Sequence, residues 1–327
     1  MNVLLVCNLG KAIGIGHLSR LLIVAQALVK KNNYNINFLI QGPYVKDQRL
    51  SKYALFIVEE DESINKALLV NQFDIVIVDI NERFCSEDIS VGLNYQKQSG
   101  AILIGIDALF KYEKILDLIF IPSFYIDSRS LDLTNAKVVY GWDCYLLEDN
   151  EENRNKHISK SSINTLILTG GSDPMSLGDH WPQELDDNLT INHEINWVVG
   201  PYSDRPILPR NPKTKIIEHV SPAGLSSLIK QADIAACVYG VSFFELLKFG
   251  IPTVVLSPYE GKDNKELELI SEMEIALVAN NTSDACAKLI ELSQDKVKSE
   301  LIARNAKARM NRHGIDRLIK EIAELQA

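Results

Sequence analysis

The sequence predicts an α/β protein made of two doubly wound, Rossmann-like domains with a cleft between them. Three observations lead to this prediction. The chain has 327 residues, short apolar runs alternate with helix-period segments, and a wholly polar stretch divides it near the middle. A chain of this length has room for two hydrophobic cores. Repeated βα units are typical of parallel sheets that helices cover on both faces.

The first half carries apolar runs of strand length. They are nearly continuous rather than alternating, as expected of strands that are buried on both faces. Between them, His17–Lys31 places its leucines at helical spacing, and Glu62–Asn71 and Glu87–Gln98 are weaker helix candidates. The predicted strands are Val3–Cys7, Ile36–Ile40, Ala54–Val58, Ile75–Val78 and Ala101–Ile106.

The second half repeats this pattern after Glu148–Lys156, which has no apolar residue and is interpreted as a linker. We therefore expect one domain over residues 1–156 and a second over 157–327. The predicted strands are Thr165–Thr169, Glu194–Val199, Lys215–Glu218, Ile234–Val238, Thr253–Leu256 and Ala276–Val278. The predicted helices are Ala223–Gln231, Val241–Phe249, Asn264–Glu274 and a long region from Ser283.

The composition narrows the functional class. A hydrophobic share of 46% is that of an ordinary globular protein, and a net charge of -9 argues against a broad nucleic-acid-binding face. No apolar stretch reaches the roughly 20 residues that span a bilayer. The five cysteines are far apart, without a C-x-x-C motif, and the N-terminus lacks a signal-peptide pattern. We therefore expect a cytoplasmic protein without a membrane span.

The segment Gly14–Arg20 is the first candidate site. It lies between a predicted strand and a predicted helix, where glycines let a ligand approach the backbone and a helix start favours an anion. Open α/β sheets bind ligands outside such strand ends. His17 is therefore a candidate general base beside an anion site. The alternative is a helix-start residue that hydrogen-bonds the loop.

The second half has two phosphate-binding candidates. Gly170–Pro174 follows a strand and offers either backbone N–H groups for a phosphate or a plain βα turn. Gly240 and Ser242 precede or begin a helix, whose N-terminus suits a diphosphate. Glu245 lies one turn further, where it can accept hydrogen bonds from ribose hydroxyls or simply stabilise the helix dipole.

In this order, these motifs resemble the GT-B class of nucleotide-sugar enzymes. The sequence is more closely similar to the PseG/SpsG-like family, which comprises UDP-sugar hydrolases of pseudaminic acid biosynthesis and spore-coat polysaccharide relatives. The resemblance covers nearly the whole chain. It lies in Gly14, Gly16, His17 and Arg20, the strand ending at Asp79, Ile106-Asp107, Gly141–Leu147, Gly170–Pro174, the helix with Glu245, and Asn264.

The resemblance implies a role for each matching residue. His17 and Asn264 would be catalytic, with His17 activating water at the anomeric carbon and Asn264 reaching the sugar side of the cleft. The diphosphate and ribose would be held by Gly171, Ser172, Gly240, Val241, Ser242 and Glu245. The sugar side would be lined by Gly14, Gly16, Arg20, Asp79 and Asp107. No cofactor and no metal is implied, and the chain shows no DxD-like pair.

The sequence departs from the hydrolase pattern in two places. Ile80-Asn81 stands where hydrolase relatives commonly carry a His-Tyr-like pair, and Ile106-Asp107 replaces an Asp-Asp pair. Both positions border the expected sugar pocket. The resemblance as a whole still implies metal-independent hydrolysis of a UDP-sugar in surface-glycan or nonulosonic acid biosynthesis, which is the leading hypothesis. A GT-B glycosyltransferase with the same donor and a non-catalytic nucleotide-sugar-binding protein are the alternatives.

The remaining histidines receive structural interpretations. His157 and His313 lie among charged residues and are expected to be solvated. His180 and Trp181 follow the Gly170-Gly171 loop and either border the cleft or begin a surface helix, which is the favoured interpretation. His219 follows a predicted strand, where it packs a loop or lies near a uracil ring.

Overall fold

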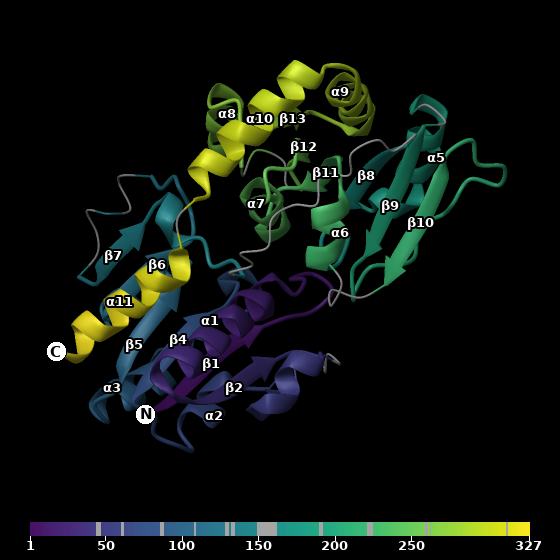
Figure 1. Ribbon diagram of the computed structural model, residues 1–327. Helices are drawn as coiled ribbons and strands as arrows, with labels where there is room; N and C mark the ends of the chain where they lie inside the picture. The colour runs from purple at the N-terminus through teal and green to yellow at the C-terminus, as the bar shows by residue number, and fades with distance from the viewer. Residues whose placement is uncertain are drawn as a thin grey trace. The chain divides into compact units, whose positions relative to one another are not determined.

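The computed structural model describes residues 1–43, 47–59, 62–85, 88–107, 109–127, 131, 135–148, 162–189, 192–220, 225–258, 261, 263–311 and 313–327. The chain divides into two compact units, Met1–Asp149 with Arg312–Ala327 and Asn150–Asn311. Each unit contains one parallel sheet with flanking helices (Figure 1). Most of the predicted linker Glu148–Lys156 lies outside the described residues, and so does His157.

The first unit contains a seven-stranded parallel sheet of order β3-β2-β1-β4-β5-β6-β7. Its strands are β1 (Asn2–Asn8), β2 (Asn35–Gln41), β3 (Ala54–Val58), β4 (Ile75–Asp79), β5 (Ile102–Ile106), β6 (Leu118–Ile121) and β7 (Lys137–Tyr140). All strands predicted for the first half are present. Two further strands, β6 and β7, were not predicted. β7 is a partly exposed edge strand without a continuous apolar run, whereas the fully buried β6 carries the same apolar pattern as the predicted strands.

Helices cover both faces of this sheet. One core packs α2 (Ile64–Leu68) and α3 (Ser90–Gln98) against inward residues such as Leu4 and Val6 of β1. The alternate residues of β1, Val3 and Leu5, are equally buried, because side chains alternate across a strand. Figure 1 shows α1 (Gly16–Asn32) and α11 (Gly314–Gln326) beside each other over the sheet.

The C-terminal helix α11 belongs to the first unit, which differs from the predicted domain range 157–327. At its start, a Cβ on Gly314 would lie 2.2 Å from the carbonyl oxygen of Tyr145. At its end, the Tyr34 hydroxyl donates to Gln326 at 3.2 Å, and Lys137 pairs with Glu324 at 2.8 Å. The second unit therefore ends before α11. Helix periodicity predicts a helix here but not the sheet on which it packs.

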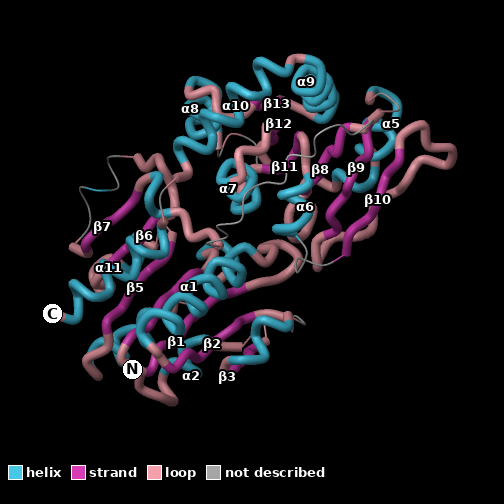
Figure 2. Tube along the Cα trace, in the orientation of Figure 1, coloured by secondary structure: helices cyan, strands magenta, loops and turns pink. Residues whose placement is uncertain are grey.

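The second unit contains a six-stranded parallel sheet of order β10-β9-β8-β11-β12-β13. Its strands are β8 (Ile163–Leu168), β9 (His193–Val199), β10 (Lys215–Val220), β11 (Ile234–Val238), β12 (Thr253–Leu256) and β13 (Leu277–Ala279). Its helices are α5 (Trp181–Asn188), α6 (Leu225–Gln231), α7 (Val241–Lys248), α8 (Asn264–Glu272), α9 (Thr282–Gln294) and α10 (Lys296–Arg309) (Figure 2). All strands predicted for this half are present.

Trp181 differs from its predicted place at the start of a surface helix. It does begin α5, but its side chain is fully buried and packs edge-on against Trp197, with 6.0 Å between ring centroids. The neighbouring His180 is exposed. The helix start was therefore predicted correctly, whereas the tryptophan belongs to the core beneath it.

Both sheets reverse their winding once. In the first unit the chain builds β1, β2 and β3 outward and then returns to place β4 on the other side of β1. In the second unit β11 returns in the same way to the other side of β8. Open α/β sheets bind ligands outside the carboxyl ends of their strands at such switch points. The functional site is therefore sought at the ends of β1 and β4 and of β8 and β11.

Two whole-chain properties complete the fold. All five cysteines are free thiols, and four of them are buried. Within the described ranges, no helix has both the length and the apolar character needed to cross a membrane.

Candidate active site

The first group of predicted site residues meets at the switch point between β1 and β4. Asp79 is the last residue of β4 and is paired in register with Cys7 of β1, while His17 is the second residue of α1. His17 Nδ1 lies 2.6 Å from Asp79 Oδ1. Asp79 is completely buried, and the His17 side chain is 13% exposed. A histidine with a small accessible surface is thus tied to a carboxylate with none.

The loop before α1 explains how the chain delivers His17 to this point. Gly10 and Gly14 form an isolated bridge, with the Gly14 N–H donating to the Gly10 carbonyl at 2.7 Å. Gly14 has a φ of 79°, a conformation that favours glycine. Gly16 is then the first residue of α1, and the preceding Ile15 gives the helix no side-chain cap. The tight turn places His17 in the first helical turn, beside the end of β4.

Arg20 holds the other side of the same carboxylate. Its Nε donates to Asp79 Oδ2 at 2.9 Å and its Nη2 donates to Asp79 Oδ1 at 2.6 Å. This two-pronged arrangement is the one that best matches a guanidinium to a carboxylate. Burial alone would raise the pKa of Asp79, but the charges of Arg20 and His17, with their hydrogen bonds, outweigh it and hold that pKa below its usual value.

The charge of Asp79 fixes the tautomer of His17. Two hydrogen-bonding atoms 2.6 Å apart need a proton between them, and an ionised carboxylate can only accept. Nδ1 of His17 therefore carries the proton that it donates to Asp79. In the neutral ring, Nε2 then keeps its lone pair and can act as a base. This is the arrangement that a histidine general base requires.

The structure changes the expected role of two residues predicted to line the sugar side. Asp79 has no accessible surface, so it orients His17 and does not contact a ligand. Arg20 is 11% exposed and engages Asp79 with two of its nitrogens. A local motif shows which residues stand at a strand end, but burial decides which of them a ligand can reach.

Asp107 lies on the solvent side of this cluster. It directly follows β5, its side chain is 48% exposed, and its Oδ2 is 3.4 Å from Arg20 Nη2. Its φ of 72° is uncommon for a residue other than glycine, although aspartate tolerates it better than most. Asp107 therefore remains a candidate for contact with a substrate.

Glu82 is a nearby carboxylate that is not among the site residues predicted from the sequence. It follows β4 at the start of a short 3-10 helix, Glu82–Phe84. Burial raises the pKa of Glu82; Lys111 acts in the opposite direction and the charge of Asp107 raises it further. Its position three residues after Asp79 was the only signal in the sequence.

The segment Ile80-Asn81, where the sequence departs from the hydrolase pattern, has a structural role. Ile80 is buried in the core. Asn81 and Asn8, at the ends of neighbouring strands, exchange hydrogen bonds. The Asn81 N–H donates to Asn8 Oδ1 at 2.8 Å and Asn8 Nδ2 donates to the Asn81 carbonyl at 3.1 Å. These two residues thus join β1 to the chain that leaves β4.

In the second unit, the loop after β8 is the first of the predicted nucleotide-binding segments. Gly170 has a φ of 90°. A Cβ on Gly200 would lie 2.4 Å from the carbonyl oxygens of both Gly170 and Gly171, and the Tyr202 N–H donates to the Gly171 carbonyl at 3.0 Å. The ends of β8 and β9 are therefore in close contact. Ser172, next in the loop, is half-buried.

Asp173 stabilises this loop from within. Its carboxylate accepts hydrogen bonds from the N–H groups of Leu177 at 3.0 Å and Gly178 at 2.7 Å. Burial raises the pKa of Asp173, and these two hydrogen bonds act against that increase. The carboxylate thus fixes the turn from Asp173 to Gly178, which directly follows Gly171 and Ser172.

The N-terminus of α7 is the second predicted nucleotide-binding segment. It follows β11, the strand beside β8. Gly240 precedes the helix and is exposed, and among the described residues a Cβ built on it would meet no atom within 4 Å. Val241, Ser242 and Glu245 follow in the first turns and are half-buried. A helix N-terminus that opens onto free space is suited to an anion.

Asn264 belongs to the same edge of the second sheet. It is the first residue of α8, which follows β12, and it is exposed. The preceding Asp263 is buried and accepts a hydrogen bond from Ser257 Oγ at 3.0 Å. The structure thus brings the predicted residues together in two groups, one at the carboxyl edge of each sheet. The residues of the first unit are Gly14, Gly16, His17, Arg20, Asp79 and Asp107, and those of the second are Gly171, Ser172, Gly240, Val241, Ser242, Glu245 and Asn264.

His219 differs from its predicted position in a loop. It lies inside the edge strand β10, where its Nε2 is 2.6 Å from Asn196 Oδ1 of β9. The structure therefore gives it a partner within the sheet. His313 precedes α11 and is exposed, as expected.

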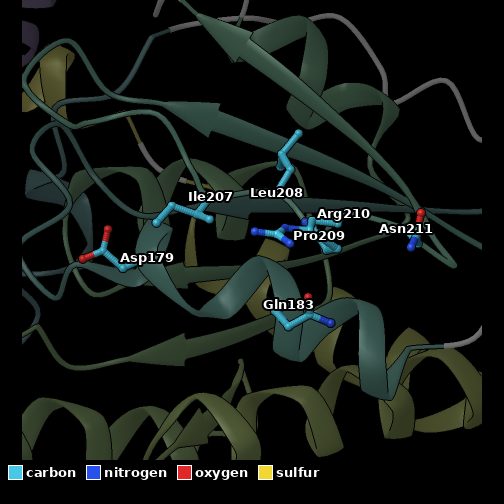
Figure 3. Close-up of a pocket in the computed structure, with 7 residues that line it drawn as sticks. All are labelled: Asp179, Gln183, Ile207, Leu208, Pro209, Arg210 and Asn211. Atoms are coloured by element: carbon cyan, nitrogen blue, oxygen red, sulfur yellow. The ribbon is translucent and has the colours of Figure 1, made fainter.

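A surface hollow of about 450 Å³ in the second unit contains none of the predicted site residues. Figure 3 shows its lining, which comes from the 3-10 helix Leu177–Asp179, from α5 and from the connection between β9 and β10. The lining residues are Asp179, Gln183, Ile207, Leu208, Pro209, Arg210 and Asn211.

Comparison with curated proteins gives two distant relatives, and no family model matches the chain. An uncharacterised protein of Methanocaldococcus jannaschii is 25% identical over 289 residues, which cover 81% of this chain and 57% of that protein. The spore coat polysaccharide biosynthesis protein SpsG of Bacillus subtilis is 30% identical over 112 residues, which cover 32% of each chain. The chain thus matches little more than half of the first relative and a third of the second.

Comparison with solved structures identifies the fold. The chain is similar over 99% of its length to MurG of Acinetobacter baumannii, with a TM-score of 0.64, 13% identity and full coverage of that chain. It is similar over 99% of both chains to UGT2 of Phytolacca americana, solved with UDP-2-fluoro-glucose and pterostilbene, with a TM-score of 0.66 and 13% identity. The two parallel-sheet, Rossmann-like domains of this chain are those of the GT-B fold.

Proposed function

We propose that this protein is a nucleotide-sugar enzyme, in which His17 removes a proton from the hydroxyl group that attacks the anomeric carbon of a UDP-sugar. The observation that carries the proposal is the His17–Asp79 pair, 2.6 Å long, at a switch point of the first sheet. The GT-B fold and the partial likeness to SpsG support the choice of a nucleotide-sugar substrate.

The reaction follows from the tautomer of His17. Nε2 accepts the proton of the attacking hydroxyl while its oxygen forms a bond to C1 of the sugar. The bond between C1 and the diphosphate oxygen breaks, and UDP leaves with the electron pair. Asp79 stabilises the imidazolium that forms, as a buried carboxylate does for a histidine base.

The nucleotide is assigned to the second unit. The N-terminus of α7, with Gly240, Val241 and Ser242, offers N–H groups and the positive end of a helix dipole to the diphosphate. Gly171 and Ser172 lie after the adjacent strand β8. Glu245 would then accept hydrogen bonds from the ribose, and Asn264 would contact the sugar.

Transfer to a sugar or lipid hydroxyl is favoured over hydrolysis. Ile80 and Asn81, which replace the His-Tyr-like pair of hydrolase relatives, are used in the core and in the Asn8 hydrogen bonds. They therefore add no second acid or base to His17. In addition, UGT2, a protein of the same fold, was solved with both a UDP-sugar analogue and a second molecule. Hydrolysis by the same base remains the alternative. The proposed setting is the biosynthesis of a surface polysaccharide, with this step taking place in the cytoplasm.

The deciding experiment is a panel of UDP- and CMP-sugars, incubated with and without hydroxyl acceptors and analysed by mass spectrometry. Transfer predicts UDP release and a glycosylated product only when an acceptor is present. Free sugar without an acceptor would establish hydrolysis instead. Binding without turnover under all conditions would refute catalysis and leave a binding protein.

His17→Asn tests the base within that experiment. Turnover should fall by roughly 10²–10⁴, the usual contribution of positioned acid–base catalysis. The loss should appear in kcat rather than KM, because the proton transfer is felt only in the transition state. UDP affinity should stay unchanged, because the proposed nucleotide contacts lie in the other unit. A variant with near-normal turnover would remove His17 from the reaction.

A further inference from the structure

Arg20 is placed to control the base rather than to bind substrate. We propose that Arg20 is a positioning residue, which fixes Asp79 and cancels its charge so that His17 is oriented without being held in its protonated form. The catalytic consequence rests on the proposed function, whereas the effect on His17 protonation does not.

The geometry makes Arg20 a rigid partner of Asp79. Both oxygens of the carboxylate accept from Arg20, at 2.9 Å from Nε and 2.6 Å from Nη2. Oδ1 also accepts from His17, so Arg20 Nη2 and His17 Nδ1 lie 3.1 Å apart because they share one acceptor. Arg20 and His17 are three residues apart in α1, on the same face of the helix. One helix turn therefore presents both the base and the counter-charge of its carboxylate.

Among the described residues, the interior side of the cluster supplies no other charge. Cys7, the partner of Asp79 in β1, is completely buried, and burial, reinforced by the charge of Asp79, raises the pKa of its thiol. Cys7 is therefore neutral. Arg20 is the cation that balances Asp79, and without it His17 would face an uncompensated buried carboxylate.

The charged groups on the solvent side of the cluster are more exposed than Asp79, so water screens their effect on His17 more strongly. Asp107, about half exposed, is 3.4 Å from Arg20 Nη2, and the half-buried Glu82 lies beyond it with the exposed Lys111. Burial would lower the pKa of Arg20, but the charges and hydrogen bonds of Asp79 and Asp107 outweigh it and raise that pKa. Arg20 therefore stays charged, and its effect on His17 is constant.

A double-mutant cycle that neutralises each charge tests this proposal without any substrate. The pH at which half of the His17 rings are protonated is measured by NMR in the wild type, Arg20→Met, Asp79→Asn and the double variant, with His17→Asn identifying the signal. Arg20→Met should raise this midpoint by about one pH unit, because a carboxylate without its counter-charge favours the imidazolium. Asp79→Asn should lower it, because a cation remains. The double variant should return close to the wild type.

Arg20→Lys separates charge from geometry and keeps the test valid if Arg20→Met does not fold. A lysine keeps the positive charge but cannot bind a carboxylate through two parallel hydrogen bonds. The midpoint should therefore stay near that of the wild type, while kcat falls with little change in KM. Under the proposed function, the acid limb of the rate profile should move in parallel with the NMR midpoint in all variants.

Several outcomes would overturn the proposal. Equal midpoints in the wild type and Arg20→Met would show that Arg20 does not compensate Asp79. Shifts of the same sign in both single variants would indicate general disruption. If Arg20→Met is unfolded, a double variant whose midpoint stays far from the wild-type value would likewise refute the proposal. Midpoints that behave as expected in a protein without turnover would instead leave the Arg20 proposal intact and refute the proposed reaction.

Discussion

Asp79→Asn provides the sharpest test of the charged cluster through protein stability. The substitution removes the charge of a completely buried carboxylate and leaves the guanidinium of Arg20, 11% exposed, without its main partner. Removing one member of a buried ion pair costs roughly 3–5 kcal/mol. Asp107 keeps one contact to Arg20 at 3.4 Å, so we expect the lower end of that range, about 3 kcal/mol.

Thermal unfolding and hydrogen exchange measure this effect. For a unit of this size, 1 kcal/mol shifts Tm by roughly 2–4 °C, so Tm of the first unit should fall by about 6–12 °C. Hydrogen exchange read by mass spectrometry should show faster exchange in peptides of α1 and β4, with peptides of β8 to β13 as the internal control. Asp316→Asn, which breaks an exposed ion pair between α11 and Lys31 of α1, is the matched control and should cost less than about 1 kcal/mol.

The pH dependence of the stability difference between the wild type and Asp79→Asn shows whether Asp79 stabilises the protein in its ionised form. The pKa of Asp79 is lowered from its ordinary value of 3.8; burial opposes this shift, and the charges of and hydrogen bonds to Arg20 and His17 prevail. The stabilisation is thus complete above the unfolded-state value and is lost as the pH falls through the lower folded-state value. The gap between wild type and variant should be wide at pH 6 and narrow toward pH 3. A gap that does not change with pH, or a variant as stable as the wild type, would refute the ionised pair.

Three further substitutions test the second unit and the C-terminal helix. Glu245→Ala should weaken UDP binding more than tenfold by isothermal titration if two ribose hydrogen bonds to a charged group are lost, at roughly 1.5–3 kcal/mol; unchanged affinity would leave Glu245 as a helix-dipole residue. Gly200→Ala should displace the Gly171 loop, because its Cβ would lie 2.4 Å from two carbonyl oxygens, and should lower both UDP affinity and urea stability, the latter by about 1–3 kcal/mol. Gly314→Ala should destabilise the first unit by a similar amount, because its Cβ would lie 2.2 Å from the Tyr145 carbonyl, and wild-type urea unfolding would contradict this packing.

The predicted elements show how far periodicity reaches. Every apolar run identified in the sequence is a strand, because buried parallel strands need continuous apolar residues. The glycine-containing segments before His17 and before Ser242 do lie between a strand and a helix. The edge strand β7 was not predicted because a partly exposed strand has no continuous apolar run, and the fully apolar β6 was overlooked although it has the required pattern.

The sequence by itself determined the α/β class, the two sheets and the positions of the chemical groups at strand ends, since these depend on local hydrophobic period and turn residues. Only the tertiary structure decided the strand order, and with it the pairing of His17 with Asp79, 62 residues further along the chain. It also decided that Asp79 is buried and bound by Arg20, and that α11 returns to the first unit. These features depend on contacts between distant segments, whose free energy no local pattern contains.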